Sequence, residues 1–468
     1  MQKVFKECLT LDRRAQDRYD LSSDIMMEHA ARSIADILHK RRAVNHEHCR
    51  VLILCGPGDN GADGYALARL LMPAYQVTIL ALYTAKSNMA IKQRDRALKL
   101  GIPLIEHHES MAIDALPEAD IYVDALFGAA QHQQISTTLK NFLHTLNHRQ
   151  GLKIACDIPT GLYEYPFKAD ITVTMGALKE DLLEDRVKDA VGEIIVADLG
   201  IPRTFYESET DTFLLDESDL RLPFRSVANS HKGSYGFLSV IKGAQSGASI
   251  LSSLAATRFG AGIVALVGVG DKPSEIMQMP EISEKTTAIA VGMGLGENID
   301  HVNLTQLLNY PLIVDADLCY SENFIQSLKD KTDVVFTPHP KEFSTLLHNA
   351  GIDSSKIYTV EEIQQNRLKL ARAFSLEYRG VLLLKGANTL IAQQGIVYIS
   401  TLGTNRLAKG GSGDVLAGMI GALLAQGNSS LEAAIQSVLA HSLVAKYSPI
   451  NDFSFTPLDL IEGLKTLS

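Results

Sequence analysis

Three glycines and one carboxylate stand together near the C-terminal end of the sequence, in the run Gly410-Gly411-Ser412-Gly413-Asp414. An apolar run at helical spacing follows from Val415 to Leu424, so the glycine loop is expected to open directly into a helix. The first turn of a helix presents unpaired N–H groups and the positive end of its dipole, which suit a phosphate that glycines let approach closely. Asp414 at the mouth of such an anion site indicates a residue that takes or relays a proton; the alternative is an N-cap aspartate.

Other strands of the second half also end in glycines or polar residues. Gly296, Asp317, His339 and Lys385 each follow an apolar run that is typical of a buried strand. Because the carboxyl ends of parallel strands meet at one edge of a sheet, we expect these residues to share a cleft with Asp414. Taken alone, His339 is equally well explained as a capped loop histidine.

Oxygen-bearing side chains follow the strands of the first half in the same way. Asn60 lies in the glycine-rich loop 58–64, Asp124 ends one apolar run, and Asp157 and Thr160 follow another. Such oxygens can hold a hard cation when they converge on one edge. Each of them can also simply cap the helix that follows. Taken together, the four residues favour a site.

The first half opens with a strand, a glycine loop and a helix, which is typical of a Rossmann-like unit. The spacing differs from Gly-x-Gly-x-x-Gly, and no acidic residue follows the next strand, over 77–82, at the position that would bind a ribose. An ordinary bound NAD coenzyme is therefore not expected.

Strands and helices alternate along all 468 residues, which predicts an α/β protein, and this length favours two domains. A polar, turn-rich stretch between about 203 and 228 is the expected linker. The net charge of −10 disfavours non-specific nucleic-acid binding. Five scattered cysteines, no signal-peptide core and no run long enough to span a bilayer predict a cytoplasmic protein without a membrane partner.

Three segments of the first half resemble the N-terminal domain of the bifunctional NAD(P)H-hydrate repair enzymes: residues 58–64, 124–128 and 157–161. In that family an NAD(P)HX epimerase precedes an NAD(P)HX dehydratase. The resemblance implies an epimerase-type domain over residues 1–210, a potassium ion held by Asn60, Asp124 and Thr160, and Asp157 as a substrate ligand and the acid/base residue. The implied hydrate contacts are Asp59, Asn60, Gly61, Ala62, Asp63, Gly128, Ala129, Ala130, Gln131, His132, Gln133, Gln134 and Asp157.

Two loops depart from the family pattern. Asp59 and Ala62 stand where the family usually has Asn and Gly, and the loop after Gly128 lacks the usual second glycine and arginine. These changes leave open a second interpretation, in which the first domain is a non-catalytic binding or assembly module.

The second half resembles the ribokinase-like dehydratase domain of the same family, over residues 225–468. The implied fold is therefore two three-layer sandwiches, one Rossmann-like and one ribokinase-like. Ala248, Gly296, His339 and Asp414 would contact the hydrate, and Asp414 would be the catalytic base. The implied nucleotide contacts are Lys385, Gly386, Ala387, Asn388, Thr389 and Gly413.

The resemblance implies NADHX or NADPHX as substrate and ADP as co-substrate, accompanied by magnesium. It also implies a homo-oligomer, a tetramer or larger. The competing hypothesis is a ribokinase-type kinase for a vitamin precursor, which shares the Gly-x-Gly-Asp motif. The histidine between prolines at 338–340, the Lys385–Thr389 loop and the fused first domain argue against that kinase.

Overall fold

The computed structural model describes residues 1–41, 49–106, 116–129, 134–296, 302–352 and 356–468. They form two compact units. One spans Lys3–Thr210, and the other contains Met1–Gln2 and Asp211–Ser468. Both are α/β units built on parallel sheets, which confirms the predicted fold class. None of the described helices combines the length and apolar character needed to cross a bilayer.

The first unit is built on a parallel sheet in the order β4-β3-β2-β5-β6-β7-β9. The chain starts this sheet at β2, adds β3 and β4 on one side, and then returns to add β5 on the other side of β2. The loops after β2 and β5 therefore diverge from a switch point, which is where open parallel sheets bind ligands. The strands are β2 (Arg50–Cys55), β3 (Gln76–Ala81), β4 (Leu104–Glu106), β5 (Ile121–Ala125), β6 (Leu152–Cys156), β7 (Ile171–Met175) and β9 (Glu193–Ala197).

Helices cover both faces of this sheet. Successive side chains of a strand point to opposite faces, and apolar side chains on both faces must be shielded from water. Val51 and Ile53 of β2 pack with α2, α3 and α4, whereas Leu52 and Leu54 pack with α5 on the opposite face. A short strand pair, β1 with β8, adds to the unit. These elements are α1 (Leu9–Tyr19), α2 (Ser23–Arg41), α3 (Asp59–Leu71), α4 (Asn88–Lys99), α5 (Thr137–His148), α6 (Lys188–Val191), α7 (Arg203–Tyr206), β1 (Gln2–Phe5) and β8 (Leu178–Lys179).

The second unit has a sheet in the order β13-β12-β11-β14-β15-β16-β17-β18-β19-β10. The strands from β13 to β17 are parallel, and β18 runs antiparallel to both β17 and β19. The strands are β10 (Thr212–Leu214), β11 (Phe237–Ile241), β12 (Ile263–Val267), β13 (Met277–Met279), β14 (Ala288–Val291), β15 (Leu312–Val314), β16 (Val334–Phe336), β17 (Val381–Leu384), β18 (Thr389–Gln393) and β19 (Ile396–Ser400).

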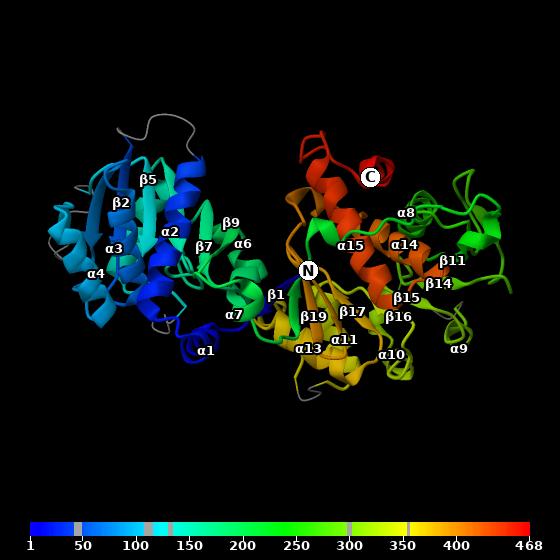
Figure 1. Ribbon diagram of the computed structural model, residues 1–468. Helices are drawn as coiled ribbons and strands as arrows, with labels where there is room; N and C mark the ends of the chain where they lie inside the picture. Colours follow the sequence, from blue (N-terminus) through cyan, green and yellow to red (C-terminus); the bar gives the residue numbers. More distant parts are fainter. Residues whose placement is uncertain (42–48, 107–115, 130–133, 297–301, 353–355) are drawn as a thin grey trace. The chain divides into compact units, whose positions relative to one another are not determined.

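Two groups of helices enclose the second sheet, with α8, α14 and α15 on one face and α10, α11 and α13 on the other (Figure 1). The aromatic rings of Phe336 on β16 and Phe343 on α11 both contact Phe374 of α13. The helices are α8 (Ser246–Arg258), α9 (Leu304–Leu307), α10 (Glu322–Ser327), α11 (Pro340–Asn349), α12 (Val360–Gln365), α13 (Arg367–Glu377), α14 (Ser412–Ala425), α15 (Ser430–Tyr447) and α16 (Pro457–Gly463).

The stretch that the sequence predicts to be a linker contains regular structure. Residues 203–206 form α7, and β10 at 212–214 pairs in parallel with β19. The short polar segments between these elements have the composition of turns, which is why the sequence predicts a linker here. The pairing partner that makes 212–214 a strand lies almost two hundred residues away, so local pattern does not indicate it.

Gly418 lets α14 approach α8 closely. A Cβ at Gly418 would lie 2.1 Å from the backbone oxygen of Ser252, which belongs to the facing helix. We expect Gly418→Ala to lower the free energy of unfolding of the second unit by about 1–3 kcal/mol, because two backbones must move apart. Chemical denaturation monitored by circular dichroism measures this change.

Gly247→Ala is the matched control, since it adds the same methyl group to α8 at a position with no atom within 4 Å of the new Cβ. Equal effects of the two substitutions would show that close helix contact is not what Gly418 provides.

Candidate functional sites

The first site lies at the switch point between β2 and β5, where glycines bring three loops together. A Cβ at Gly56 would lie 1.7 Å from the backbone oxygen of Leu126, and a Cβ at Gly61 would lie 2.1 Å from the oxygen of Gly56. No side chain fits at either position. The loop after β2 therefore folds directly onto the loop after β5, and α3 starts beside both.

Gly128, Asn60 and Asp157 converge at this point. A Cβ at Gly128 would lie 3.0 Å from Oδ2 of Asp157 and 3.4 Å from Oδ1 of Asn60. Both polar atoms of the Asn60 side chain are buried and have no hydrogen-bond partner within the described structure. An unpartnered buried amide is unfavourable, and it indicates that a ligand supplies the missing contacts.

Asp124 and Thr160 form a buried pair at the carboxyl ends of β5 and β6. The Thr160 hydroxyl donates to Oδ1 of Asp124 over 2.8 Å, and the Thr160 backbone N–H donates to Oδ2 over 2.7 Å. Both residues are fully buried. Burial raises the pKa of Asp124 to about 6, although the hydrogen bonds from Thr160 oppose that shift. A cation near this carboxylate would reduce the cost of its burial.

Asp157 is held by more contacts than any other predicted residue of this site. Its backbone adopts a left-handed conformation, with a φ of 65°, which is uncommon for a residue with a side chain. Oδ1 accepts from the Lys179 ammonium over 2.5 Å and from the Met175 N–H over 3.2 Å, and Oδ2 accepts from the Ala129 N–H over 3.2 Å. Burial opposes ionisation, but the Lys179 charge and these donors lower the pKa of Asp157 below its ordinary value.

Lys179 is a site residue that the sequence did not reveal. Its side chain is 3% exposed and forms an ion pair with Asp157. In the sequence it stands directly before Glu180 and Asp181, where a lysine is most simply explained as part of a charged surface. Only the pairing of β8 with β1 places it inside the unit.

The remaining predicted residues of the first site are buried, exposed or outside the described part of the chain. Asp63 is buried, and burial together with the nearby Asp157 carboxylate raises its pKa well above the ordinary value. Ala62 packs in the core, so any contact it makes with a ligand must come from its backbone. Asp59, Ala129 and Gln134 are exposed, whereas residues 130–133 lie outside the described part of the chain.

The second site is built around the first turn of α14. The helix begins after Gly411, whose φ of 94° needs glycine, and no side chain caps it. Asp414 is therefore not the N-cap, and that alternative interpretation of the motif is wrong. Its carboxylate forms no hydrogen bond within the described residues, whereas its backbone oxygen accepts from the Ser252 hydroxyl over 2.6 Å. Burial and the nearby Asp315 carboxylate raise the pKa of Asp414 to about 6.

A buried ion pair lies beside this turn. The Lys385 ammonium donates to Oδ1 of Asp315 over 2.8 Å, and the Thr337 hydroxyl donates to the same oxygen over 2.8 Å. A Cβ at Gly413 would lie 3.4 Å from the Lys385 nitrogen, so the ammonium faces the glycine loop. The Asp315 side chain is 3% exposed and the Lys385 side chain is 22% exposed, so part of the lysine reaches the surface of the site. The Lys385 charge also opposes the rise in the pKa of Asp414, so the structure brings together Lys385, Gly413 and Asp414.

His339 has a structural role in addition to its predicted contact with the hydrate. It is the N-cap of α11, where Nδ1 accepts from the N–H groups of Lys341 and Glu342. Nε2 lies 3.1 Å from Oε1 of Glu342. The neighbouring Pro338 carbonyl accepts from the Lys385 N–H over 2.9 Å, which places His339 next to the nucleotide loop. The side chain is 47% exposed, so its outer edge can still contact a ligand.

The loop after β14 and the start of α8 lie together. The Gly296 N–H donates to Oδ2 of Asp317 over 2.7 Å. A Cβ at Gly294 would lie 3.0 Å from the Ala248 Cβ, and a Cβ at Gly296 would lie 3.2 Å from the Ala244 Cβ. Ala248 and Gly296, two of the predicted substrate contacts, therefore border the same loop.

Arg367 fixes the start of the loop Lys385–Thr389, because its guanidinium donates to the carbonyls of Leu384 and Lys385. Gly386 and Ala387 are exposed, whereas Asn388 is buried. This arrangement presents the backbone of the loop to solvent, as a nucleotide-binding loop requires.

His441 is a second residue that the sequence did not reveal. Its ring lies beneath the glycine loop, with Nε2 3.0 Å from the Ser412 carbonyl oxygen. Burial lowers the pKa of His441 to about 4, so the ring is neutral at pH 7. Its sequence neighbours on α15 are mostly apolar, which indicates only a core histidine.

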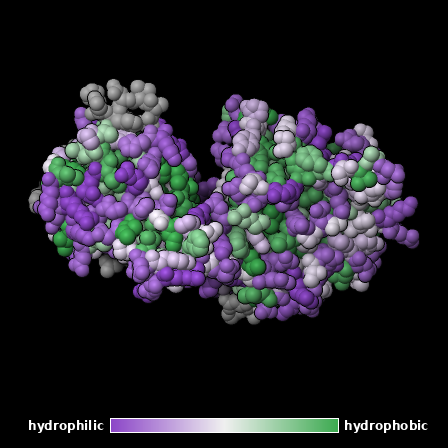
Figure 2. Space-filling view, viewed as in Figure 1, coloured by the Kyte–Doolittle hydropathy of each residue, from purple (hydrophilic) through white to green (hydrophobic). Residues whose placement is uncertain are grey.

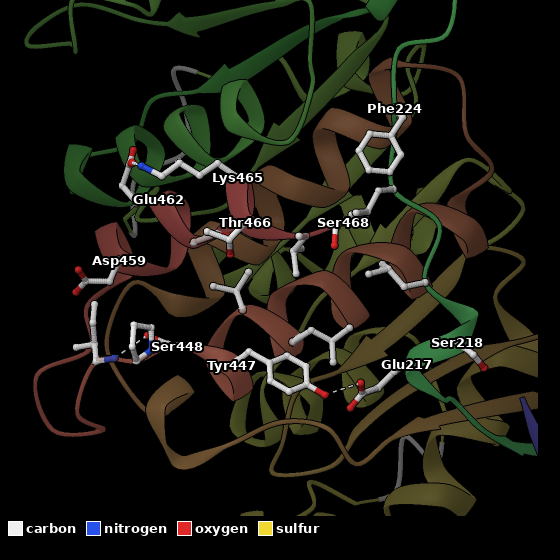
Figure 3. Close-up of a pocket in the computed structure, with 18 residues that line it drawn as sticks. Glu217, Ser218, Phe224, Tyr447, Ser448, Asp459, Glu462, Lys465, Thr466 and Ser468 are labelled. Atoms are coloured by element: carbon white, nitrogen blue, oxygen red, sulfur yellow. Dashed lines mark hydrogen bonds and ion pairs between the residues drawn. The ribbon is translucent and has the colours of Figure 1, made fainter.

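A separate groove of about 660 Å³ lies near the end of α15 and contains none of the predicted site residues (Figure 3). Figure 2 shows hydrophobic surface over this part of the second unit. The Tyr447 hydroxyl donates to Glu217 over 2.7 Å, Asp459 accepts from Thr456, and Glu462 is paired with Lys465. Since these carboxylates already have partners, the groove does not resemble a catalytic centre.

Comparisons with known proteins place both halves of the chain in one family. Residues 23–180 match the family model for the YjeF-related protein N-terminus, and residues 238–465 match the model for NAD(P)H-hydrate dehydratase. The chain is 42% identical to the bifunctional NAD(P)H-hydrate repair enzyme Nnr of Helicobacter pylori, with 100% of both chains covered. The chain belongs to the bifunctional NAD(P)H-hydrate repair enzymes.

Further similarities extend across the NAD(P)H-hydrate repair family. The Nnr enzyme of Dictyoglomus turgidum is 32% identical, over 93% of this chain and 91% of that one. Among solved structures, the ADP/ATP-dependent NAD(P)H-hydrate dehydratase of Bacillus subtilis, co-crystallized with ATP and Mg²⁺, is 27% identical with a TM-score of 0.43. It covers 52% of this chain and 92% of that chain. Family membership confirms the resemblance noted in both halves of the sequence, while the individual site residues remain predictions.

The raised pKa of Asp414 leads to a pH prediction for a repair enzyme. A base must be ionised, and with a pKa of about 6 Asp414 is mostly protonated at pH 5 and mostly ionised at pH 7. We expect kcat/KM of the dehydratase reaction to fall about tenfold per pH unit below about pH 6. Initial rates of NADH formation from the purified S epimer, measured between pH 4.5 and 8, provide the test. A pH profile that is flat across this range would exclude Asp414 as the base.

Proposed function

We propose that the second unit dehydrates the S epimer of NADHX or NADPHX and converts ADP to AMP and phosphate. The observation that carries this proposal is the Asp414 carboxylate, which stands without a hydrogen-bond partner among the described residues at the start of α14, with a raised pKa and beside Lys385. A core or capping role would not leave a half-buried carboxylate in that state.

In the proposed reaction Asp414 takes the proton from the hydroxyl group of the hydrate. The hydroxyl oxygen attacks the terminal phosphorus of ADP, and the bond to the bridging oxygen breaks, which releases AMP. Phosphate then leaves the ring carbon with its electron pair, and loss of a ring proton restores the dihydronicotinamide double bond. The oxygen of the hydrate therefore ends in inorganic phosphate. The amides of the glycine loop and the Lys385 ammonium stabilise the transferring phosphoryl group.

The nucleotide would contact the loop Lys385–Thr389 and Gly413, and the hydrate would contact Ala248, Gly296, His339 and Asp414. Lys385 suits a phosphate because its ammonium is buried on one side against Asp315 and still partly exposed. We also propose that magnesium accompanies the nucleotide, since it neutralises phosphate charge and retains water and phosphate oxygens as ligands.

We propose that the first unit interconverts the R and S epimers of the hydrate, which makes both available to the dehydratase. Asp157 serves as the acid/base residue, and the loops 59–63 and 128–134 contact the substrate. Support comes from the convergence of Gly128, Asn60 and Asp157 at the switch point. Burial and the nearby Asp157 carboxylate raise the pKa of Asp63, whereas the Lys179 charge lowers that of Asp157, and acid–base catalysis uses two carboxyl groups whose pKa values are pushed apart in this way.

The residues proposed to hold potassium fit a hard cation. Asn60 offers an unpartnered buried oxygen, and Asp124 and Thr160 offer two more oxygens within hydrogen-bond distance of each other. When bound, the cation would supply positive charge near the substrate oxygen. The Asp124–Thr160 pair also fixes the start of the loop at Phe127, whose N–H donates to the Thr160 hydroxyl over 3.1 Å.

We further propose that the chain works in the cytoplasm as a homo-oligomer, a tetramer or larger. All five cysteines are buried free thiols, which suits a reducing compartment.

Recovery of absorbance at the reduced-nicotinamide band tests both activities together. A mixture of R and S hydrates is supplied with ADP or ATP to the wild type, Asp414→Ala and Asp157→Ala. We expect full recovery with the wild type, no recovery with Asp414→Ala, and prompt recovery of the S share alone with Asp157→Ala. The ADP and ATP arms show which nucleotide supports the reaction.

The other outcomes favour the competing interpretations. Recovery that stops at the S share in the wild type would identify the first unit as a binding or assembly module. No recovery with either nucleotide would exclude the proposed dehydratase and favour a kinase of the ribokinase type.

The potassium proposal has a test that does not depend on activity. We expect potassium chloride to raise the melting temperature of the wild type above its value in choline chloride at equal ionic strength, because a ligand that binds the native state stabilises it. Asn60→Leu should abolish that difference, since it removes the unpartnered oxygen. The control Asn141→Leu, on the exposed face of α5, should retain it. Equal melting temperatures of the wild type in the two salts would contradict a potassium site.

A further inference from the structure

The two carboxylate oxygens of Asp157 have different hydrogen-bond partners, because Lys179 pairs with only one of them. Oδ1 receives the Lys179 ammonium at 2.5 Å and the Met175 N–H at 3.2 Å, and the Thr174 hydroxyl lies 3.4 Å away. Among the described residues, Oδ2 receives a hydrogen bond from the Ala129 N–H alone, at 3.2 Å, and it faces the space beside Gly128. One oxygen is therefore saturated with donors, while the other is turned toward the loop that borders the site.

Lys179 is itself fixed by its surroundings. Its ammonium also donates to the Thr174 hydroxyl over 2.9 Å and lies 3.4 Å from the Met175 carbonyl. The strand that carries it, β8, pairs with β1, where Phe5 stands opposite Lys179. With 3% of its side chain exposed, Lys179 cannot reach a substrate directly.

Backbone strain at Asp157 makes this anchoring necessary. The residue occupies the left-handed region, with a φ of 65°, which costs about 1 kcal/mol for a residue with a Cβ. Such a conformation persists only where the surrounding contacts hold it. The bonds to Oδ1 provide that hold, since Thr174, Met175 and Lys179 all come from β7, β8 or the turn that joins them.

We propose that Lys179 is the positioning residue of the epimerase site, which anchors Oδ1 of Asp157 and keeps Oδ2 as the ionised oxygen that exchanges a proton with the hydrate. This inference rests on the proposed role of Asp157. It assigns a function to a lysine that no family motif quoted for the first unit contains.

Other titratable groups surround this pair and must be considered in any pH experiment. The first segment of the chain places Cys8 and Asp12 near Lys179, and Tyr206 of α7 donates to Asp12 over 2.7 Å. Asp63 of α3 approaches Asp157 from the opposite side. Lys179 is the cation among these groups, and every other member is a carboxyl, a thiol or a phenol. Loss of Lys179 would therefore remove positive charge from a cluster of acidic groups.

Lys179→Met tests the proposal, because methionine fills a similar volume without a charge. The intact protein is supplied with the R epimer, and epimerisation is measured by a coupled dehydratase reaction with excess Asp157→Ala protein present to supply that second activity. We expect kcat of epimerisation to fall about a hundredfold or more with little change in KM, and its acid limb to move upward by about two pH units. Lys153→Met, in the same unit, is the matched control, since the Lys153 ammonium donates to the Arg149 carbonyl and to no other group among the described residues, so the substitution should leave both values unchanged.

A direct measurement keeps the proposal testable if Lys179→Met lowers the stability of the first unit. The carboxyl carbon of Asp157 can be followed by NMR in the wild type, with Asp157→Asn used to assign its signal. We expect Asp157 to stay ionised well below the ordinary aspartate pKa of about 3.9. Titration at or above that value would overturn the proposal, as would a Lys179→Met protein whose epimerase pH profile matches that of the wild type.

The Asp157→Asn protein separates this proposal from the proposed function on which it depends. If Asp157→Asn retains full epimerase activity, the assignment of Asp157 is wrong, and Lys179 loses its role with it. If Asp157→Asn is inactive and Lys179→Met behaves as the wild type, only the positioning role is overturned.

Discussion

An ion pair between a lysine and an aspartate stands in each of the two sites, and the buried member of each pair needs the opposite charge of its partner. Lys179 is paired with Asp157 in the first unit, and Lys385 is paired with Asp315 in the second. An uncompensated buried charge is strongly destabilising, so neither pair can separate without a large cost in stability. Lys179 on β8 thereby fixes Asp157 after β6, and Lys385 after β17 fixes Asp315 after β15.

The buried member of the ion pair differs between the two units. In the first unit the lysine is buried and the aspartate faces the site, so the cation serves to keep a carboxylate ionised. In the second unit the aspartate is buried and the lysine is partly exposed, so the anion serves to hold an ammonium where a phosphate can reach it. Asp414 remains outside the second pair, and burial raises its pKa to about 6. The proposed base thus has a pKa near neutrality and stands beside a fixed cation, the combination that phosphoryl transfer to a poorly acidic hydroxyl requires.

Much of this arrangement could be predicted from the sequence, because apolar runs that end in glycines or polar residues mark strands and their carboxyl ends. Asn60, Asp124, Asp157 and Thr160 follow from that pattern, as do His339, Lys385 and Asp414.

Lys179 and His441 could not be found in this way. Lys179 precedes two acids, a pattern typical of a charged surface, and the strand that carries it, β8, pairs with β1, which lies far away in the chain. His441 lies within an apolar helix, and its role depends on the packing of α15 beneath the glycine loop. Such long-range contacts leave no periodic signal in the sequence.

The altered residues of the loop 59–63 bear on the chemistry of the first unit less than their residue types indicate, whereas residues 130–133 of the other altered loop lie outside the described part of the chain. Ala62 packs in the core, so its methyl group does not occupy the space above the loop. Asp59 is exposed, and its charge is screened by solvent more than a buried charge would be. The atoms that the proposed chemistry needs are elsewhere: Oδ2 of Asp157, the amide of Asn60 and the Asp124–Thr160 pair. A binding module without catalytic function would have no need for a strained aspartate held against a buried lysine, because strain of that kind is retained where a reacting group must be kept in place.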